Sequence, residues 1–315
     1  MCHVMDLVTA AASARDNVLV SGEPGTGREM VARAIHARSR QAHAPFVTVD
    51  CSRRASHDLE TELFGLPVTP GVGGKVERRA IERVTRLGAL YRAVIGTLFL
   101  EQVVELPARA QLRLSRILRD QEAVIQNEGE HVHMDVRAMT AADGSFDTAV
   151  AEGRIEADLH RRLTAFRIEV PPLRHRKDDI PALAAHFVSG ICHRAHVPCK
   201  CLSEPAQILL AALPWRGNAP ELRALLEGLV MRVPGQTIGL EDVLANIQLD
   251  GRAGRLMAGG SLREARDRFE REYIAAVLAQ YRGRIPDAAR TLGIQRTNLY
   301  RKLKRLDLKP GRNDA

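Results

Sequence analysis

The sequence predicts an α/β fold, with a mainly parallel sheet that carries helices on both faces and is followed by helical regions. Two observations support this prediction. Short apolar segments alternate with amphipathic segments through the first half of the chain, and from about Asp178 the strand signals stop while helical periodicity continues. In such a fold, ligands bind at the carboxyl ends of the parallel strands.

The strands of the sheet are predicted from short apolar runs bounded by turn residues, at residues 17–20, 46–49, 97–100 and 135–139. A glycine-rich turn and a helix over residues 29–38 follow the first strand. A small all-helical lid is predicted from three further helices, at residues 180–195, 204–213 after the capping Ser203, and 220–233.

The predicted elements divide the chain of 315 residues into four parts. These are an α/β part over residues 1–175, the helical lid over 176–249, a linker over 250–260 and a C-terminal helical unit over 261–309. The linker prediction rests on the stretch DGRAGRLMAGG, which is rich in glycine and poor in large apolar side chains.

Composition indicates a folded protein without membrane contact, because 45% of the residues are hydrophobic but no apolar run approaches the ~20 residues of a membrane-spanning helix. The chain opens without a basic and apolar leader, so we expect a cytoplasmic location. Its five cysteines are odd in number and scattered, and we expect them to be reduced thiols.

Positive charge is concentrated at the C-terminus. From Leu262 onward, 14 Lys and Arg stand against 7 Asp and Glu, a balance of +7 out of +8 for the whole chain. Such a distribution predicts a polyanion partner for the C-terminal unit, the alternative being a solvated basic face without a partner.

The segment GEPGTGREM, residues 22–30, has the context of a phosphate-binding loop: a strand, then G-x-x-x-x-G, then a helix. Main-chain N–H groups and the helix N-terminus can cradle anionic oxygens there. Arg28 stands where such loops carry lysine, and its broad planar guanidinium is not equivalent to the compact ammonium group of lysine. The nucleotide-binding residues predicted from this segment are Gly22, Glu23, Gly25, Thr26, Gly27, Arg28 and Glu29.

Together with this loop, a set of segments along nearly the whole chain resembles the AAA+ domain of sigma-54-dependent transcriptional activators. The segments are residues 22–36, 45–51, 60–65, 96–107, 135–143, 158–163, 171–187 and 214–222. The resemblance implies the AAA+ P-loop fold, a ring of subunits that bind ATP between neighbours, and action on the RNA polymerase holoenzyme.

The catalytic positions that the resemblance implies are altered here. The acidic pair after the third strand is Glu101 and Gln102, and Gln102 has no titratable group with which to serve as general base. Glu156 stands where the resemblance implies an arginine that reaches the phosphate of a neighbouring subunit (a trans arginine). This leaves Arg162 as the candidate trans arginine. No residue is therefore assigned as catalytic, and Glu101, Gln102 and Arg162 are only the positions that match the family's catalytic sites. ATP binding without hydrolysis stays open, with Mg²⁺ held through Glu101.

Two further positions depart from the family. Pro220 stands at the position where the resemblance implies an arginine of the lid. The loop at residues 66–84 lacks the Phe-Thr tip that family members present to sigma-54. Since proline is tolerated in the first turn of a helix, the lid helix can keep its structure without that charge. Contact with sigma-54 is therefore not expected.

Residues 284–308 predict a helix-turn-helix, with Ala289, Gly293 and Leu299 at the small, turn and core positions. Its second helix buries Leu299, Leu303 and Leu306. The stretch resembles the Fis-type DNA-binding domain that ends such activators. We predict that Arg296, Thr297 and Asn298 contact base edges, and that phosphates are contacted by Arg301, Lys302, Lys304 and Arg305.

An amphipathic helix over residues 262–281 precedes this motif and could supply a homodimer contact, with Phe269, Tyr273, Ala276, Val277 and Gln280 on one side. The cluster CHRAHVPCKC at residues 192–201 does not match the paired C-x2-C spacing of common zinc sites, and no metal site is predicted. His131, His133 and Asp135 alternate along a predicted strand and so share one face, for which a solvated sheet edge is the favoured interpretation.

These observations predict a DNA-binding transcriptional regulator on an altered AAA+ scaffold, with double-stranded DNA and RNA polymerase as partners and a dimer or ring as its assembly. No receiver domain is expected before the AAA+ part. An active ATPase that remodels sigma-54 polymerase is one alternative, and a scaffold that joins an intact relative in mixed oligomers is another.

Overall fold

The structure is a computed structural model that describes residues 2–52, 56–65, 81–126, 128–249 and 284–306, together with residues 270, 271, 273–275, 277, 278 and 281. The chain forms two compact units, Met1–Pro171 and Pro172–Ala315. Each unit has its own hydrophobic cores. The predicted linker over residues 250–260 lies outside the described residues.

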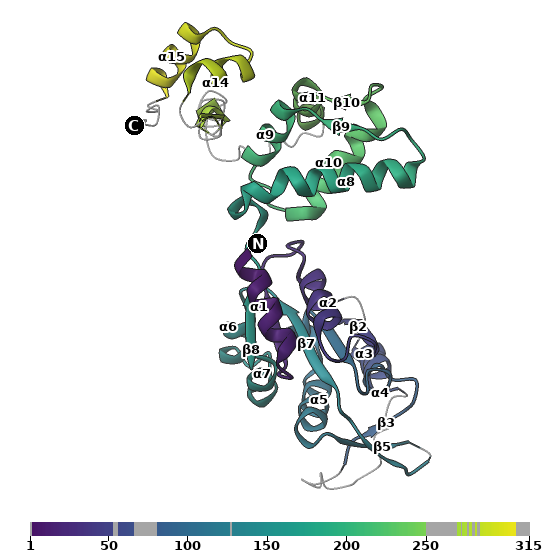
Figure 1. Cartoon of the computed structure of the whole chain (residues 1–315). Coiled ribbons are helices and arrows are strands. Elements are labelled where there is room, and N and C mark those ends of the chain that lie inside the picture. The colour runs from purple at the N-terminus through teal and green to yellow at the C-terminus, as the bar shows by residue number, and fades with distance from the viewer. Residues whose placement is uncertain are drawn as a thin grey trace. The chain divides into compact units, whose positions relative to one another are not determined.

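The first unit is organised around a five-stranded sheet in the order β2-β4-β7-β1-β8. Every pairing within this sheet is parallel, so the carboxyl ends of its strands lie along one edge (Figure 1). The strands are β1 (Val18–Ser21), β2 (Phe46–Asp50), β4 (Thr97–Glu101), β7 (Arg137–Ala142) and β8 (Phe166–Glu169). The predicted parallel sheet is confirmed.

Helices cover both faces of this sheet because its strands are apolar on both sides. In β1, Val18 and Val20 join one core and Leu19 joins the other, as the two-residue period of a strand requires. The first core packs against α1 (Cys2–Ser13) and α2 (Arg28–Arg38). The second packs against α3 (Ser56–Phe64), α4 (Ala89–Arg92), α5 (Ala108–Asp120), α6 (Phe146–Ala151) and α7 (Ala157–Leu163).

A smaller sheet in the same unit has the order β3-β5-β6. Its strands are β3 (Arg83–Val84), β5 (Glu122–Ile125) and β6 (His131–His133), and β6 lies at an edge. The side chains of His131 and His133 are exposed there. This confirms the interpretation of the two histidines as part of a solvated strand edge. Asp135 differs from that prediction, because it lies beyond the end of β6, is half-buried and pairs with Arg15.

The turn into β4 holds a β-branched residue in a left-handed conformation. Ile95 has φ = 67° and its side chain is 63% exposed, while its N–H donates to the Asp135 carbonyl over 2.8 Å. The next residue has no room for a side chain, because a Cβ on Gly96 would lie 2.2 Å from the Pro45 carbonyl oxygen. Since a Cβ carries a steric penalty at positive φ, Ile95 stores strain without burying much apolar surface.

We expect Ile95→Gly to stabilise the chain by on the order of 0.5–1 kcal/mol. Relief of about 1–2 kcal/mol of left-handed strain exceeds the greater entropy that glycine loses on folding. Urea unfolding measures the difference. Ile95→Ala serves as the control, since alanine keeps a Cβ and should recover little of the gain. Destabilisation by Ile95→Gly would show that the isoleucine side chain stabilises this turn.

The second unit begins with a helical bundle formed by α8 (Ile180–Ala195), α9 (Glu204–Ala212), α10 (Asn218–Arg232) and α11 (Leu240–Leu249). Short 3₁₀ turns, η2 (Leu173–His175) and η3 (Lys177–Asp179), lead into it. A two-residue parallel pairing of β9 (Cys201–Leu202) with β10 (Thr237–Ile238) accompanies the helices. The predicted helical lid is confirmed, and Ser203 caps α9 by accepting from the Ala206 N–H over 3.4 Å.

The last described part of the chain is a helix-turn-helix, formed by α14 (Ile285–Thr291) and α15 (Arg296–Arg305) and drawn in yellow in Figure 1. Gly293 takes the left-handed turn with φ = 66°, as predicted. Ala289, Leu299, Leu303 and Leu306 are buried in one core, which confirms the predicted small and core positions.

Candidate functional site

The loop between β1 and α2 has the backbone shape of an anion cradle. Gly25 and Gly27 have φ = 78° and 96°, and the buried Thr26 hydroxyl donates to the Glu23 carbonyl over 2.8 Å. A Cβ on Gly22 would lie 2.7 Å from the Val170 carbonyl oxygen, so the loop can pass β8 only as glycine. The N-cap residue of α2 is Gly27, which has no side chain to accept from the first N–H groups of the helix, so these donors can face an anion.

The side chain of Arg28 turns back under this loop. It is 4% exposed, its Nη1 donates to the Gly22 carbonyl over 2.9 Å, and its Nη2 lies 3.8 Å from Glu101 Oε1. Burial lowers the pKa of Arg28, while Glu101 and then Asp143 oppose that shift by favouring the charged form. The cation that the sequence predicts as a phosphate ligand is therefore held by groups of its own chain.

Glu101 and Gln102, which stand where the resemblance implies an acidic pair, lie at the carboxyl end of β4. Glu101 is the last residue of the strand, and Gln102 has φ = 55° and leads into the turn η1 (Val103–Glu105). The main chain of Gln102 is anchored by its N–H, which donates to the Ala141 carbonyl over 3.1 Å. The structure thus brings Arg28 and Glu101 together at the strand ends, and the neighbouring Gln102 carries an amide instead of a carboxylate.

Asp143 belongs to the same charged group although the sequence analysis did not select it. It follows β7, and its Oδ1 accepts from the Ser145 N–H over 3.0 Å and from the Ser145 hydroxyl over 2.5 Å. The hydrogen bond from the Ser145 hydroxyl is the main cause that lowers the pKa of Asp143, with a smaller contribution from Arg28. Its position directly after a central strand was the signal that could have identified it.

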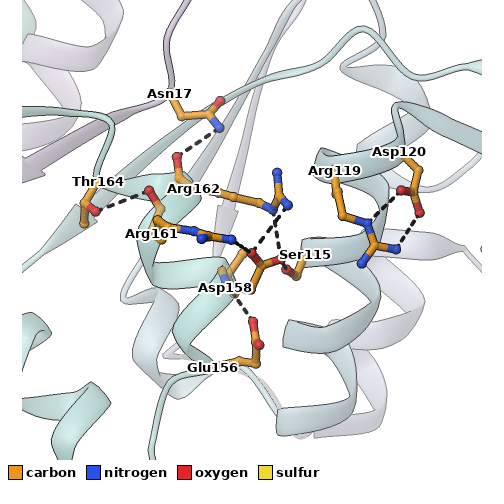
Figure 2. Close-up of polar contacts among 10 residues, drawn as sticks. Asn17, Ser115, Arg119, Asp120, Glu156, Asp158, Arg161, Arg162 and Thr164 are labelled. Atoms are coloured by element: carbon orange, nitrogen blue, oxygen red, sulfur yellow. Dashed lines mark hydrogen bonds and ion pairs between the residues drawn. The ribbon is translucent and has the colours of Figure 1, made fainter. Parts of the chain in front are cut away.

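Glu156, which stands in place of the expected arginine, is an N-terminal cap. Its Oε2 accepts from the Leu159 N–H over 2.7 Å at the start of α7, as Figure 2 shows. Its main-chain N–H donates to Gln111 Oε1 over 2.8 Å. A carboxylate is favoured at this end of a helix because it satisfies an unpaired donor and complements the helix dipole.

Arg162, the candidate trans arginine, is tied to Asp158 one turn earlier in α7 (Figure 2). Its Nε donates to Asp158 Oδ2 over 3.0 Å, and Ser115 of α5 donates to the same oxygen over 2.8 Å. Arg161 bonds to Oδ1 of this carboxylate, yet its side chain stays 77% exposed. These donors, the Ser115 hydroxyl foremost, lower the pKa of Asp158 to about 2.

The Asp158 carboxylate should stabilise the fold only at pH values at which it is ionised in the native state. Because its pKa is lowered from the ordinary value of about 3.9, its contribution is fully present above about pH 4 and is lost as the pH falls through about 2. We expect the free energy of unfolding of wild type to exceed that of Asp158→Asn by a constant amount above pH 4. That difference should shrink between pH 4 and pH 2 in urea titrations, and a difference independent of pH would contradict the assignment.

The predicted DNA contacts lie on α15, opposite its buried leucines. Arg296, Thr297, Asn298 and Arg301 are exposed, whereas Lys302 is half-buried. Arg305 is exposed, and both it and Lys302 bond to Glu270, a residue that the sequence analysis did not select. The side chain of Lys304 lies outside the described part of the structure, as do Phe269, Ala276 and Gln280 of the predicted dimer helix.

The cysteine and histidine cluster at residues 192–201 surrounds the end of α8. The helix stops at Ala195 and His196 takes a left-handed cap with φ = 54°. Cys192 is buried, whereas Cys199 and Cys201 are exposed free thiols. Among the described residues, no group of three or more His, Cys, Asp and Glu side chains is placed to hold a metal ion. Within the same residues, no helix combines the length and the apolar character that crossing a membrane requires.

Three protein-family models match successive parts of the chain. Residues 1–169 match the Sigma-54 interaction domain, residues 174–255 match an AAA+ ATPase lid domain, and residues 265–306 match the Fis family of bacterial regulatory proteins. The order of these matches is that of the α/β unit, the lid and the helix-turn-helix. The predicted family and fold are confirmed.

Known regulators are similar over most of this chain. The nitrogen assimilation regulatory protein NtrX of Azorhizobium caulinodans is 35% identical over 298 residues, which cover 92% of this chain and 63% of the relative. The transcriptional regulatory protein ZraR of Escherichia coli is 34% identical, with 97% of this chain and 67% of ZraR covered. The chain thus spans about two thirds of the length of these relatives.

Solved structures of NtrX from Brucella abortus share the fold. The crystal structure of its complex with ATP aligns with a TM-score of 0.71 at 30% identity, and the alignment covers 98% of this chain and 68% of that one. The complex of the same protein with ADP aligns with a TM-score of 0.70, also at 30% identity and with the same coverage.

Proposed function

This chain belongs to the family of sigma-54-dependent transcriptional activators, and we propose that it is a DNA-binding regulator whose ATP hydrolysis is impaired and which acts without contact to sigma-54. The observation that carries the proposal is the pairing of Arg28 with Glu101 and the Gly22 carbonyl, beside a strand end that offers Gln102. The helix-turn-helix, in contrast, keeps an exposed basic face.

Weak nucleotide binding fits the residues present. The glycine loop and the uncapped start of α2 offer main-chain donors for phosphate oxygens. Glu101 would hold Mg²⁺, but only in competition with Arg28, and Arg28 would have to leave its two partners to reach a phosphate. The complexes of Brucella abortus NtrX with ATP and ADP support a nucleotide site in this chain as well.

Impaired hydrolysis is supported by the chemistry of two side chains. The amide of Gln102 cannot accept a proton from an attacking water molecule, so it cannot act as general base. Glu156 places a carboxylate at the start of α7, where the resemblance implies an arginine that stabilises phosphate charge on a neighbouring subunit. Arg162, the remaining candidate for that role, already binds Asp158.

Independence from sigma-54 rests on the sequence, since most of the loop at residues 66–84 lies outside the described residues. A homodimer through the C-terminal unit and a ring through the AAA+ part are proposed as assemblies, with RNA polymerase as the partner at the promoter. Cytoplasmic location follows from this proposed role, because the chromosomal DNA lies there.

Purified wild type should bind duplex DNA but hydrolyse ATP no faster than Arg28→Ala. The physical reason is that the site lacks a general base, whereas the exposed cations of α15 are available to DNA. Phosphate release with and without DNA measures turnover, and fluorescence anisotropy measures binding. Rapid turnover that Arg28→Ala abolishes would favour an active ATPase instead. Co-purification with an intact relative, together with negligible DNA binding alone, would favour the mixed-oligomer scaffold.

Glu101→Gln should raise the affinity for ADP about 3- to 10-fold when Mg²⁺ is removed with a chelator. The variant keeps the size of the side chain but removes the counter-charge of a buried guanidinium, which then gains more from a phosphate. Isothermal titration calorimetry measures the change. Glu105→Gln is the matched control, because Glu105 is an exposed acid of the adjoining turn. Equal affinities in the two variants would contradict a competition between Glu101 and phosphate for Arg28.

A further inference from the structure

One carboxylate binds two of the cations predicted to contact phosphates. Glu270 Oε2 lies 2.9 Å from Lys302 Nζ and 2.5 Å from Arg305 Nη2. The side chain of Glu270 is only 18% exposed, whereas those of Lys302 and Arg305 are 32% and 53% exposed. A carboxylate that is largely shielded from water and bonded to two cations contributes more stabilising free energy than an ordinary surface ion pair.

The packing of the C-terminal unit explains why Glu270 meets the end of α15. Ile274, Val277 and Leu278 share a core with Leu299 and Leu303 of that helix. Glu270 lies one helical turn before Ile274, so it extends the same face beyond the apolar contact. Lys302 and Arg305 occupy the last turn of α15, where cations also complement the helix dipole.

The first and last turns of α15 consequently differ in charge balance. Arg296, Thr297 and Asn298 are exposed at the first turn, and within the described residues no ion pair joins Arg296 to a carboxylate. At the last turn, the Glu270 carboxylate offsets part of the positive charge of Lys302 and Arg305. Phosphate oxygens must compete with this carboxylate for the same N–H groups.

We propose that Glu270 is a positioning residue for DNA recognition, which restrains Lys302 and Arg305 and so weakens binding to DNA of any sequence. The inference rests on the proposed DNA binding, and it adds a contact that favours binding to a specific DNA sequence over binding to any other. Because phosphate contacts act on every sequence alike, their restraint lowers non-specific affinity while base-edge contacts from the first turn are kept.

The test compares full-length wild type with Glu270→Gln on a non-specific duplex over a range of salt concentrations. Each additional phosphate contact steepens the dependence of log K on log salt by about 0.9. We expect Glu270→Gln to steepen the slope by between one and two such steps, and to raise the affinity at low salt about 3- to 10-fold.

Asp287→Asn provides the matched control. It removes the same charge from the same unit, but Asp287 pairs with Arg290 of α14 over 3.7 Å and not with α15. A second comparison places Glu270→Gln in a chain that also carries Lys302→Gln and Arg305→Gln. There the effect of Glu270→Gln should fall to that of Asp287→Asn, because no restrained cations remain to be released.

The outcomes separate this inference from the proposed function. A wild-type chain that binds no duplex contradicts the proposed DNA binding, and the role of Glu270 falls with it. If wild type binds DNA but Glu270→Gln and Asp287→Asn have the same salt slope, only the role of Glu270 is overturned. It is also overturned if Glu270→Gln binds more weakly while its circular dichroism and melting temperature match those of wild type.

Discussion

The buried guanidinium of Arg28 constrains the whole strand-end site. A cation removed from water must be paired and hydrogen-bonded within the protein, and Arg28 obtains these partners from the Gly22 carbonyl and from Glu101. The glycine loop therefore encloses a positive charge belonging to its own chain. The same guanidinium also contributes to the low pKa of Asp143, so the charge at the start of α2 is coupled to the carboxylates at the ends of β4 and β7.

Carboxylates hold cations at each of the three regions that the proposed function involves. Glu101 pairs with Arg28 at the glycine loop, and Asp158 holds Arg161 and Arg162 on α7. Glu270 holds Lys302 and Arg305 on α15. An anionic ligand at any of these places competes with an internal acid, which lowers affinity and makes binding depend on exchange between partners. The same competition therefore applies at the proposed nucleotide site and at the basic helix.

Local sequence patterns were sufficient to predict the helices and strands, and to predict the conformation or burial of several single residues. The helix α8 was predicted at residues 180–195 and spans Ile180–Ala195, because its apolar period and its flanking signals all act within the helix. The left-handed turn at Gly293 and the buried Leu299 followed in the same way from motif spacing. The domain boundaries and the roles of the site residues stay predictions, because sequence patterns indicate which elements form and not what they bind.

By itself the sequence determined the alternating α/β pattern, the family, the glycine loop and the amide at Gln102, since each depends on residue types in a recognisable order along the chain. Only the tertiary structure decided where the long side chains go. Arg28 contacts Glu101, which lies 73 residues later in the sequence. Glu270 contacts Lys302, which lies 32 residues later. Such pairs depend on which strand ends and helix faces become neighbours, and on a rotamer choice that burial imposes, neither of which is written in local periodicity.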